Sequence, residues 1–171
     1  MLRIIAEKEE ITAASLVAHS VELTDVTLSK AGVSGSVYLH NKFDVKIHLK
    51  LSDPTTRFEL GPTGSDVMFV FTEMKVEGYN VDQENKGGIK QPVFLIQAEF
   101  VAEFGIPSGE MPASIREKGL PAFTRLNGPY ICMPYLREFI DGLARQMRLT
   151  LPPLPTVVIE EKMDDPVPEK Q

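Results

Sequence analysis

Alternating apolar and polar side chains mark the clearest element of the chain. Over residues 43–51 the apolar positions are spaced by two, at Phe43, Val45, Ile47, Leu49 and Leu51. Charged or polar residues separate them. Because successive side chains of a strand point to opposite faces, this pattern predicts a half-buried strand with one face in water.

Three further segments have the character of strands. From Val21 to Leu28 the alternation slips at Thr24 and Asp25, which predicts a strand with a bulge. Residues 67–76 are apolar on both faces, so protein should cover both sides of that strand. Residues 92–104 alternate cleanly again. Since turn residues separate the last three of the four strands, we expect an antiparallel meander.

A helical pattern follows near the C-terminal end. From Pro134 onward, apolar side chains recur at helical spacing, at Tyr135, Leu136, Phe139, Ile140, Leu143 and Met147. Charged residues occupy the opposite side. Because proline suits the first position of a helix, the pattern predicts an amphipathic helix that begins at Pro134.

The remaining segments predict connections and extended chain. Residues 31–36 contain two glycines and indicate a flexible crossover, and residues 105–122 indicate a long irregular connection with at most one helical turn. Residues 149–159 are apolar but too rich in proline for a helix, so an extended segment lying on a surface is expected. Residues 5–18 suggest a short helix.

Size and charge bound the class of protein. The chain has 171 residues, of which 43% are hydrophobic and 25% charged, as expected for one globular domain. We place that domain at residues 1–159, with residues 1–18 as an N-terminal extension. The acidic tail of residues 160–171 should be disordered. The formal net charge of −6 makes nucleic acid a poor partner, and no apolar stretch is long enough for membrane insertion.

Candidate chemistry is sparse. Cys132 is the only cysteine, which excludes an internal disulfide and a thiolate metal cluster and suits the cytoplasm. Its position between apolar neighbours predicts a buried, unreactive thiol. Three scattered histidines do not form a metal pair, and no export signal, nucleophile elbow, phosphate loop or zinc motif is present. We therefore expect neither an enzyme nor a cofactor.

The segment of residues 127–155, NGPYICMPYLREFIDGLARQMRLTLPPLP, resembles the SecB family of export chaperones. In that family the helix begins with an aromatic-Pro-Tyr-Ala-Arg-Glu motif and ends in an apolar, proline-containing segment. Pro134, Tyr135, Arg137 and Glu138 match the motif, and Leu136 replaces its alanine. SVELTDVTL resembles the first strand of the family, and the order of elements is the same over Val21 to Leu154.

The resemblance implies an α+β fold in which a four-stranded antiparallel sheet carries one long C-terminal amphipathic helix on one face. It also implies a homotetramer, built as a dimer of dimers, that holds unfolded or nascent polypeptides in apolar grooves without ATP. The clients would be unfolded preproteins or an antitoxin. The helix stripe would then serve both as core and as oligomer interface, through Tyr135, Phe139, Ile140, Leu143 and Met147.

Specific residues follow from the same resemblance. The residues expected to line the client groove, or else to cap the core, are Val37, Tyr38, Leu39, Phe43, Val45, Leu151, Leu154, Val157 and Ile159. Asp25 matches an acidic residue near the surface where the export motor SecA docks, but Ser29 stands where the family has a second acidic residue. The hairpin of residues 77–91 is longer than in the family, and the final family helix is absent. These departures favour a toxin–antitoxin or phage chaperone over a general export factor.

Two other classes of function stay open at this point. A non-enzymatic scaffold or adaptor subunit would use the same sheet and helix surface to bind one folded partner. A small-ligand domain or enzyme would have its site under residues 105–122. We rank the last interpretation lowest because no convergent polar cluster is visible in that segment.

Overall fold

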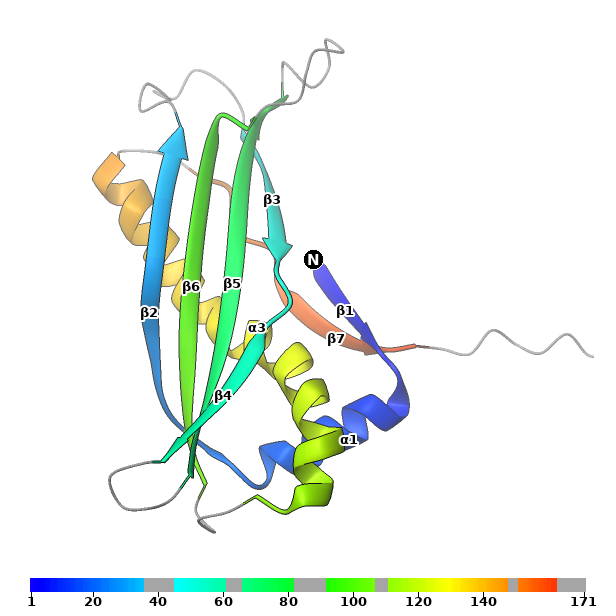
Figure 1. The fold of residues 1–171 in the computed structure, drawn as a ribbon. Helices are drawn as coiled ribbons and strands as arrows, with labels where there is room; N and C mark the ends of the chain where they lie inside the picture. The colour runs from blue at the N-terminus through cyan, green and yellow to red at the C-terminus, as the bar shows by residue number, and fades with distance from the viewer. Residues whose placement is uncertain (36–44, 61–65, 82–91, 107–110, 148–150, 163–171) are drawn as a thin grey trace, which may run out of the picture.

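The computed structural model describes residues 1–35, 45–60, 66–81, 92–106, 111–147 and 151–162. A five-stranded antiparallel sheet carries one long helix on one face, and a two-stranded parallel ribbon lies beside it (Figure 1). The elements in chain order are β1 (Leu2–Ala6), α1 (Lys8–Ala18), β2 (Glu22–Gly35), β3 (Val45–Leu51), β4 (Thr55–Leu60), β5 (Asp66–Asn80), β6 (Phe94–Gly105), α3 (Ala113–Met147) and β7 (Val157–Glu161).

The predicted fold class is confirmed, with one strand more than expected. The strand order is β2–β6–β5–β3, and β4 pairs with the other end of β5. Leu51 pairs with Met74 and Thr55 with Phe71, so β3 and β4 follow one edge of β5. Pro54 lies between them and has no backbone N–H to donate, which explains why this edge is divided into two strands.

Strand β2 corrects the expected crossover. Residues 31–35 continue the strand, pairing from Ala31 with Ala98 to Gly35 with Phe94. The flexible crossover predicted for residues 31–36 is therefore wrong over its described part. The ladder along β6 satisfies this backbone, and Gly35, at φ 147°, packs so closely on Phe94 that a side chain would collide with it. The predicted bulge is confirmed by a register shift between Leu23 and Asp25.

Helix α3 begins at Ala113, so the prediction of an irregular connection is wrong over residues 113–122. The predicted start at Pro134 is wrong too, because Pro121, Pro129 and Pro134 all lie inside the helix. Each proline removes one helical hydrogen bond, which is why the sequence pattern suggested a break. Packing of the buried side chains Phe123 and Leu126 offsets that loss.

The core lies between α3 and the inner face of the sheet, which is the face turned toward the helix. Along β6 every second side chain is buried, from Phe94 to Phe104, as the alternation predicts. On β5 Met68, Val70, Met74 and Val76 are buried. The ring of Phe123 meets Phe104 edge-on at 5.4 Å between centroids. These contacts fix α3 across β5 and β6.

The ends of the chain form the parallel ribbon. Strand β1, which the sequence did not reveal, pairs with β7 from Leu2 and Val157 to Ala6 and Glu161. Helix α1 occupies most of the segment expected to be a short helix. Glu160 and Glu161, placed in the acidic tail from sequence, belong to β7, and residues 163–171 lie outside the described residues. The domain limits remain a prediction.

Candidate functional site

An apolar face is left open along β2. Among the described residues β2 pairs only with β6, so it forms one edge of the sheet. Leu23, Leu28 and Val33 lie on its inner face, yet they are between 38% and 45% exposed. Helix α3 packs mainly on β5 and β6, and these three β2 side chains each keep more than a third of their surface exposed. An uncovered apolar edge of this kind is typical of a surface that another chain covers.

The apolar stripe of α3 is divided between core and surface. Ile140 is buried against the sheet, whereas Tyr135 is 39% exposed. Phe139 and Leu143 are half-buried. The side chain of Met147 lies outside the described residues. Three of the five residues expected at an oligomer interface are thus available to a second subunit in this protomer.

The segment that follows α3 holds most of the described residues expected to bind clients. Residues 151–156 lie behind the sheet and lead into β7 (Figure 1). Leu151, Leu154 and Ile159 are half-buried and pack against the core, whereas Val157 is only 4% exposed. The guanidinium of Arg137 donates a hydrogen bond of 3.1 Å to the Pro155 carbonyl, which holds the segment onto the helix.

The other expected client-binding residues lie on or before β3. Val45 is half-buried on the inner face of β3, where it pairs with Asn80. Val37, Tyr38, Leu39 and Phe43 lie outside the described residues. The half-buried members of the expected set among the described residues are Val45, Leu151, Leu154 and Ile159, which we call the client surface for the role expected of them. Val157 lies in the core beneath it.

Asp25, the residue expected to contact a translocase, lies at the bulge of β2. One carboxylate oxygen accepts a hydrogen bond of 2.8 Å from the Val26 backbone N–H. The other accepts one of 2.9 Å from the Thr27 hydroxyl. Both bonds are local, so the carboxylate stabilises the bulge and remains exposed on the outer face of the sheet.

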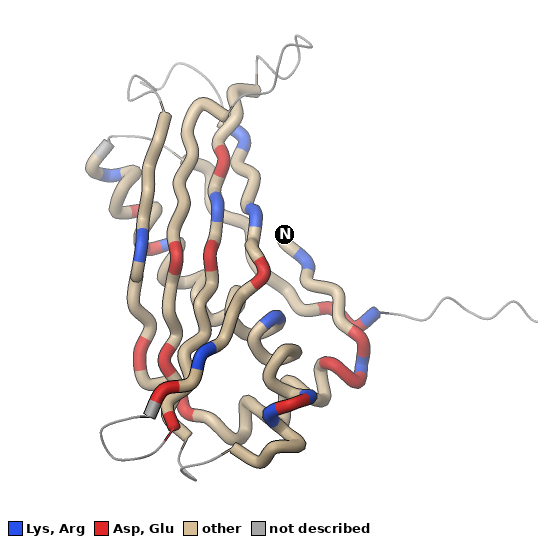
Figure 2. Tube along the Cα trace, viewed as in Figure 1, with Lys and Arg blue, Asp and Glu red and all other residues tan. Residues whose placement is uncertain are grey.

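Acidic and basic residues alternate along the strands (Figure 2), and several of them pair on the outer face of the sheet, which is turned away from α3. Lys50 on β3 lies 2.8 Å from the Glu77 carboxylate, which also accepts a bond of 2.6 Å from the Tyr79 hydroxyl. The bond to Lys50 and then the one to Tyr79 lower the pKa of Glu77. The hydroxyl of Ser29 and the ammonium of Lys30, both on β2, lower the pKa of Glu99 on β6. This face is wet, as the sequence predicts for β3.

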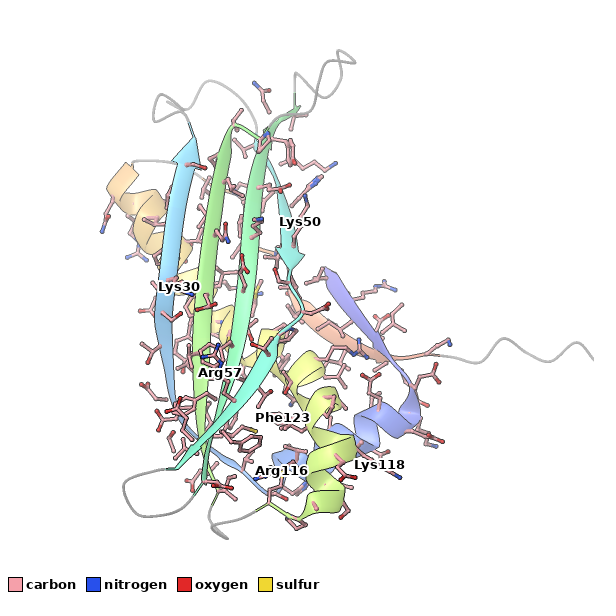
Figure 3. The ribbon with its side chains drawn as sticks, in the orientation of Figure 1. Lys30, Lys50, Arg57, Arg116, Lys118 and Phe123 are labelled. Carbon is pink, nitrogen blue, oxygen red and sulfur yellow. The ribbon has the colours of Figure 1, made fainter. Side chains whose placement is uncertain are left out.

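Cations also cover aromatic rings at the end of the sheet formed by β4. Arg57 lies over the ring of Phe71 at 5.0 Å, and Arg116 lies over Phe58 at 4.5 Å (Figure 3). Arg116 also donates to the Asp66 carboxylate at 3.0 Å. Each guanidinium group therefore shields part of one ring face from water.

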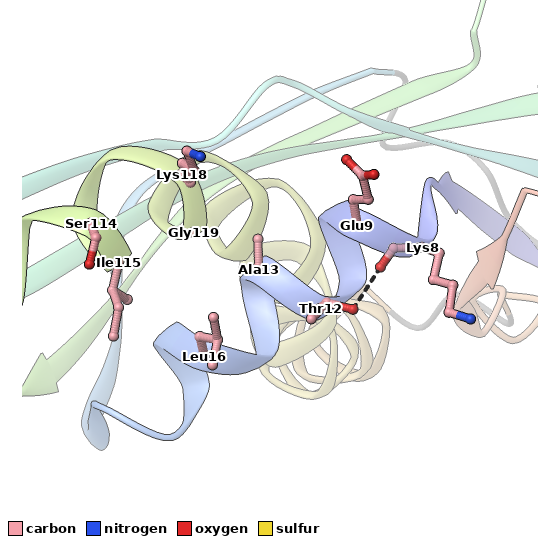
Figure 4. Close-up of a pocket in the computed structure, with 9 residues that line it drawn as sticks. All are labelled: Lys8, Glu9, Thr12, Ala13, Leu16, Ser114, Ile115, Lys118 and Gly119. Atoms are coloured by element: carbon pink, nitrogen blue, oxygen red, sulfur yellow. Dashed lines mark hydrogen bonds between the residues drawn. The ribbon is translucent and has the colours of Figure 1, made fainter.

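A pocket of about 390 Å³ lies between α1 and the first turns of α3 (Figure 4). Its mostly apolar wall includes Ala13, Leu16 and Ile115, and Lys8, Glu9 and Lys118 extend from it in different directions. The Thr12 hydroxyl is used within α1, where it donates 2.9 Å to the Lys8 carbonyl. The residues therefore form no convergent polar set for catalysis, although the pocket touches the segment where a ligand site was considered.

The single thiol of the chain is buried. Burial raises the pKa of the Cys132 thiol to about 11, so the thiolate is scarce at neutral pH. No three histidine, cysteine or acidic side chains within the described ranges could hold a metal ion together. No helix in the described part of the chain is long and apolar enough to span a bilayer.

Comparison with solved structures identifies a protein whose fold is similar to that of this chain. It is the Rv1957 SecB-like chaperone of Mycobacterium tuberculosis, in complex with a ChAD peptide from the Rv1956 HigA1 antitoxin. The TM-score is 0.65 at 20% sequence identity, over 85% of this chain and 96% of that chain. This chain has a SecB-like fold. No protein-family model and no curated protein matches the sequence.

The resemblance inferred from residues 127–155 and from the order of strands is thus confirmed at the level of the fold. Within this SecB-like fold, sequence reasoning missed the open inner face of β2. The alternation of Leu23, Val26 and Leu28 signals a half-buried strand but cannot say what covers it. It also missed the β1–β7 ribbon, whose strands have five residues each.

Proposed function

We propose that this protein is an ATP-independent holding chaperone that binds unfolded or nascent polypeptides on the client surface. The observation that carries the proposal is a SecB-like fold in which an extended apolar segment lies half-exposed beside the sheet. The solved neighbour is a SecB-like chaperone bound to a peptide, which supports a peptide ligand for this fold. No catalytic residue is required for such a role.

The energetics favour weak, promiscuous binding. Each Å² of apolar area removed from water contributes about 25 cal/mol, and the client loses conformational entropy when it is ordered. A surface of half-buried leucine and isoleucine side chains offers apolar area with few polar groups that would demand one particular partner. The net charge of −6 keeps a chain with open apolar surface in solution and favours basic clients.

The clients we propose are unfolded preproteins or an antitoxin. The peptide on the neighbour comes from an antitoxin, which supports the second class. The SecA motor is a further proposed partner through Asp25, whose exposed carboxylate could meet a cation. Ser29, however, is engaged with Glu99 and supplies no second acid. We therefore favour an antitoxin client over general export, with the protein acting in the cytoplasm.

The assembly we propose is a homotetramer, arranged as a dimer of dimers. The edge of β2 supports it, because β2 pairs only with β6 among the described strands and exposes Leu23, Leu28 and Val33. The half-exposed stripe of Tyr135, Phe139 and Leu143 supplies a second apolar surface. Two different surfaces of this kind are what a dimer of dimers needs.

Binding of a permanently unfolded protein tests the proposal. Labelled, reduced and carboxymethylated lactalbumin should bind the full chain without nucleotide. Leu154→Ser should weaken binding about fivefold, because a client no longer buries that side chain. Leu16→Ser on α1, which is exposed in the wall of the pocket beside α3 and is not part of the client surface, serves as the matched control and should bind normally. Binding of folded lactalbumin alone would instead favour the adaptor interpretation.

A further inference from the structure

In the parallel ribbon, β7 is paired with β1, a strand with apolar inward side chains. Strand β7 continues directly from the client surface and pairs with β1 over five residues. Backbone bonds of 2.8 Å extend the pairing at both ends, from Leu2 N–H to the Thr156 carbonyl and from Lys162 N–H to the Ala6 carbonyl. The chain's own N-terminus therefore occupies this edge of β7.

The contacts that hold β1 are modest. Leu2 and Ile4 are only partly buried against the core and Ile5 is 59% exposed, whereas Ala6 is buried and the Arg125 guanidinium donates to the Ile5 carbonyl at 3.3 Å. The ion pairs of Arg3 with Glu160 and of Glu7 with Lys162 are exposed, and such pairs contribute little. Because residues 2–4 are held only by strand pairing and partial burial, this part of β1 can separate from β7 at small cost.

Helix α1 is held far more firmly than β1. Val17 is fully buried, and Gly119 of α3 approaches the Ala13 carbonyl so closely that a side chain there would collide with it. The Arg125 guanidinium binds the Glu10 carboxylate, with Nε donating at 2.6 Å. Between the two elements Glu7 is extended, at φ −70° and ψ 149°. Strand β1 is thus a short arm tethered to an anchored helix.

We infer that β7 is a strand-pairing seat for the client and that residues 2–6 are an internal occupant which the client displaces. The inference rests on the proposed holding function. The occupant defines the ligand class, because its inward side chains Leu2, Ile4 and Ala6 are apolar and its outward Arg3 meets Glu160. The seat therefore takes an extended apolar segment with a basic residue, paired in parallel with β7.

Because β1 is tethered to α1, it competes with a client for pairing with β7 at a constant effective concentration. A strand attached a few residues from its seat has an effective concentration on the order of millimolar. A client with only one weak apolar contact cannot displace it, whereas a client that also covers Leu151 and Leu154 can. The arm thereby keeps β7 covered when no client is present and selects long apolar segments.

A disulfide between Arg3→Cys and Val158→Cys tests the inference in the full chain. These positions are paired across the ribbon, neither belongs to the client surface, and the native Cys132 is buried. Oxidation should lock the arm and weaken binding of carboxymethylated lactalbumin about tenfold, because the seat can no longer open. Reduction of the same protein should restore normal binding. Equal affinity of the two forms would overturn the inference while leaving the holding function intact.

A matched disulfide and a second readout complete the test. Thr27→Cys with Val101→Cys joins β2 to β6 on the outer face, and its oxidation should leave binding unchanged. In the unmodified protein, hydrogen exchange of residues 2–6 should speed up when lactalbumin binds, while Val17 stays protected. Unchanged exchange of the arm on binding would also overturn the inference. If neither redox form binds, the proposed function fails and the inference fails with it.

Discussion

Individual residues show that a sequence pattern identifies apolar positions in extended segments but does not predict how much of each side chain is exposed. Val45, Leu154 and Val157 are all apolar positions in extended segments, and the sequence treats them alike. Only the structure separates Val157, which is buried, from Val45 and Leu154, which are half-buried. The difference depends on which residues surround each side chain in the folded structure, and residue type alone does not predict these neighbours.

Two glycines of α3 should respond oppositely to alanine. At Gly119 a Cβ would lie 2.7 Å from the Ala13 carbonyl oxygen, so Gly119→Ala should lower the free energy of unfolding by about 2 kcal/mol. At Gly142 nothing lies within 4 Å of the added Cβ, so Gly142→Ala should raise it by about 0.5 kcal/mol. Urea denaturation of both variants checks this. Equal effects would contradict the close packing of α1 on α3.

The charge pair on the outer face predicts a dependence on pH. The pKa of Glu77 is lowered in the folded state, so its stabilisation is present at neutral pH and is lost as the pH falls through that lowered pKa. Glu77→Gln should therefore cost about 1 kcal/mol at pH 7 and progressively less in acid. Unfolding curves at several pH values measure the difference. Glu138→Gln, on the exposed side of α3, is the control for removing one carboxylate elsewhere on the surface.

At the level of elements, regular alternation was sufficient to place the long strands. The patterns of residues 43–51 and 92–104 predict β3 and β6 well because both strands have one buried face. Helix α3 escaped prediction before Pro134 because local proline rules oppose it and only tertiary packing supports it. The β1–β7 pair escaped because it joins two short strands from opposite ends of the chain, so no local signal records their register.

The prolines of α3 give a direct test of that argument. Pro134 is exposed, so Pro134→Ala restores a helical hydrogen bond without leaving a cavity. We expect a gain of about 1 kcal/mol in the free energy of unfolding, after allowing for the greater freedom of the unfolded chain. Pro129 is buried, and Pro129→Ala should gain less because its ring contacts are lost. A loss of stability in Pro134→Ala would show that the helix needs this proline.

For the whole molecule, the SecB-like architecture could be predicted from one motif and the order of strands, but its assembly could not. An apolar residue covered by its own helix and one covered by a second subunit have the same sequence signature. The open inner face of β2 became visible only when α3 was seen to pack on β5 and β6. The proposed tetramer rests on that face.

A charge introduced on one or the other face of β2 tests which face forms the proposed oligomer interface. Leu28→Asp puts a carboxylate on the open apolar face, so the proposed tetramer should dissociate into smaller species. Thr27→Asp places the same charge on the outer face of the same strand and should leave the assembly intact. Native mass spectrometry gives the mass of both variants. A tetramer that survives Leu28→Asp would exclude this face as its interface.

The central claim is that the chain holds unfolded polypeptide without nucleotide, and suppression of aggregation measures it most directly. Citrate synthase diluted from denaturant should scatter less light as the full chain is added, with no ATP present. The suppression should saturate near a fixed ratio of the two proteins and should be weaker with Leu154→Ser. Undiminished scattering at a large excess of the folded chain would contradict the account.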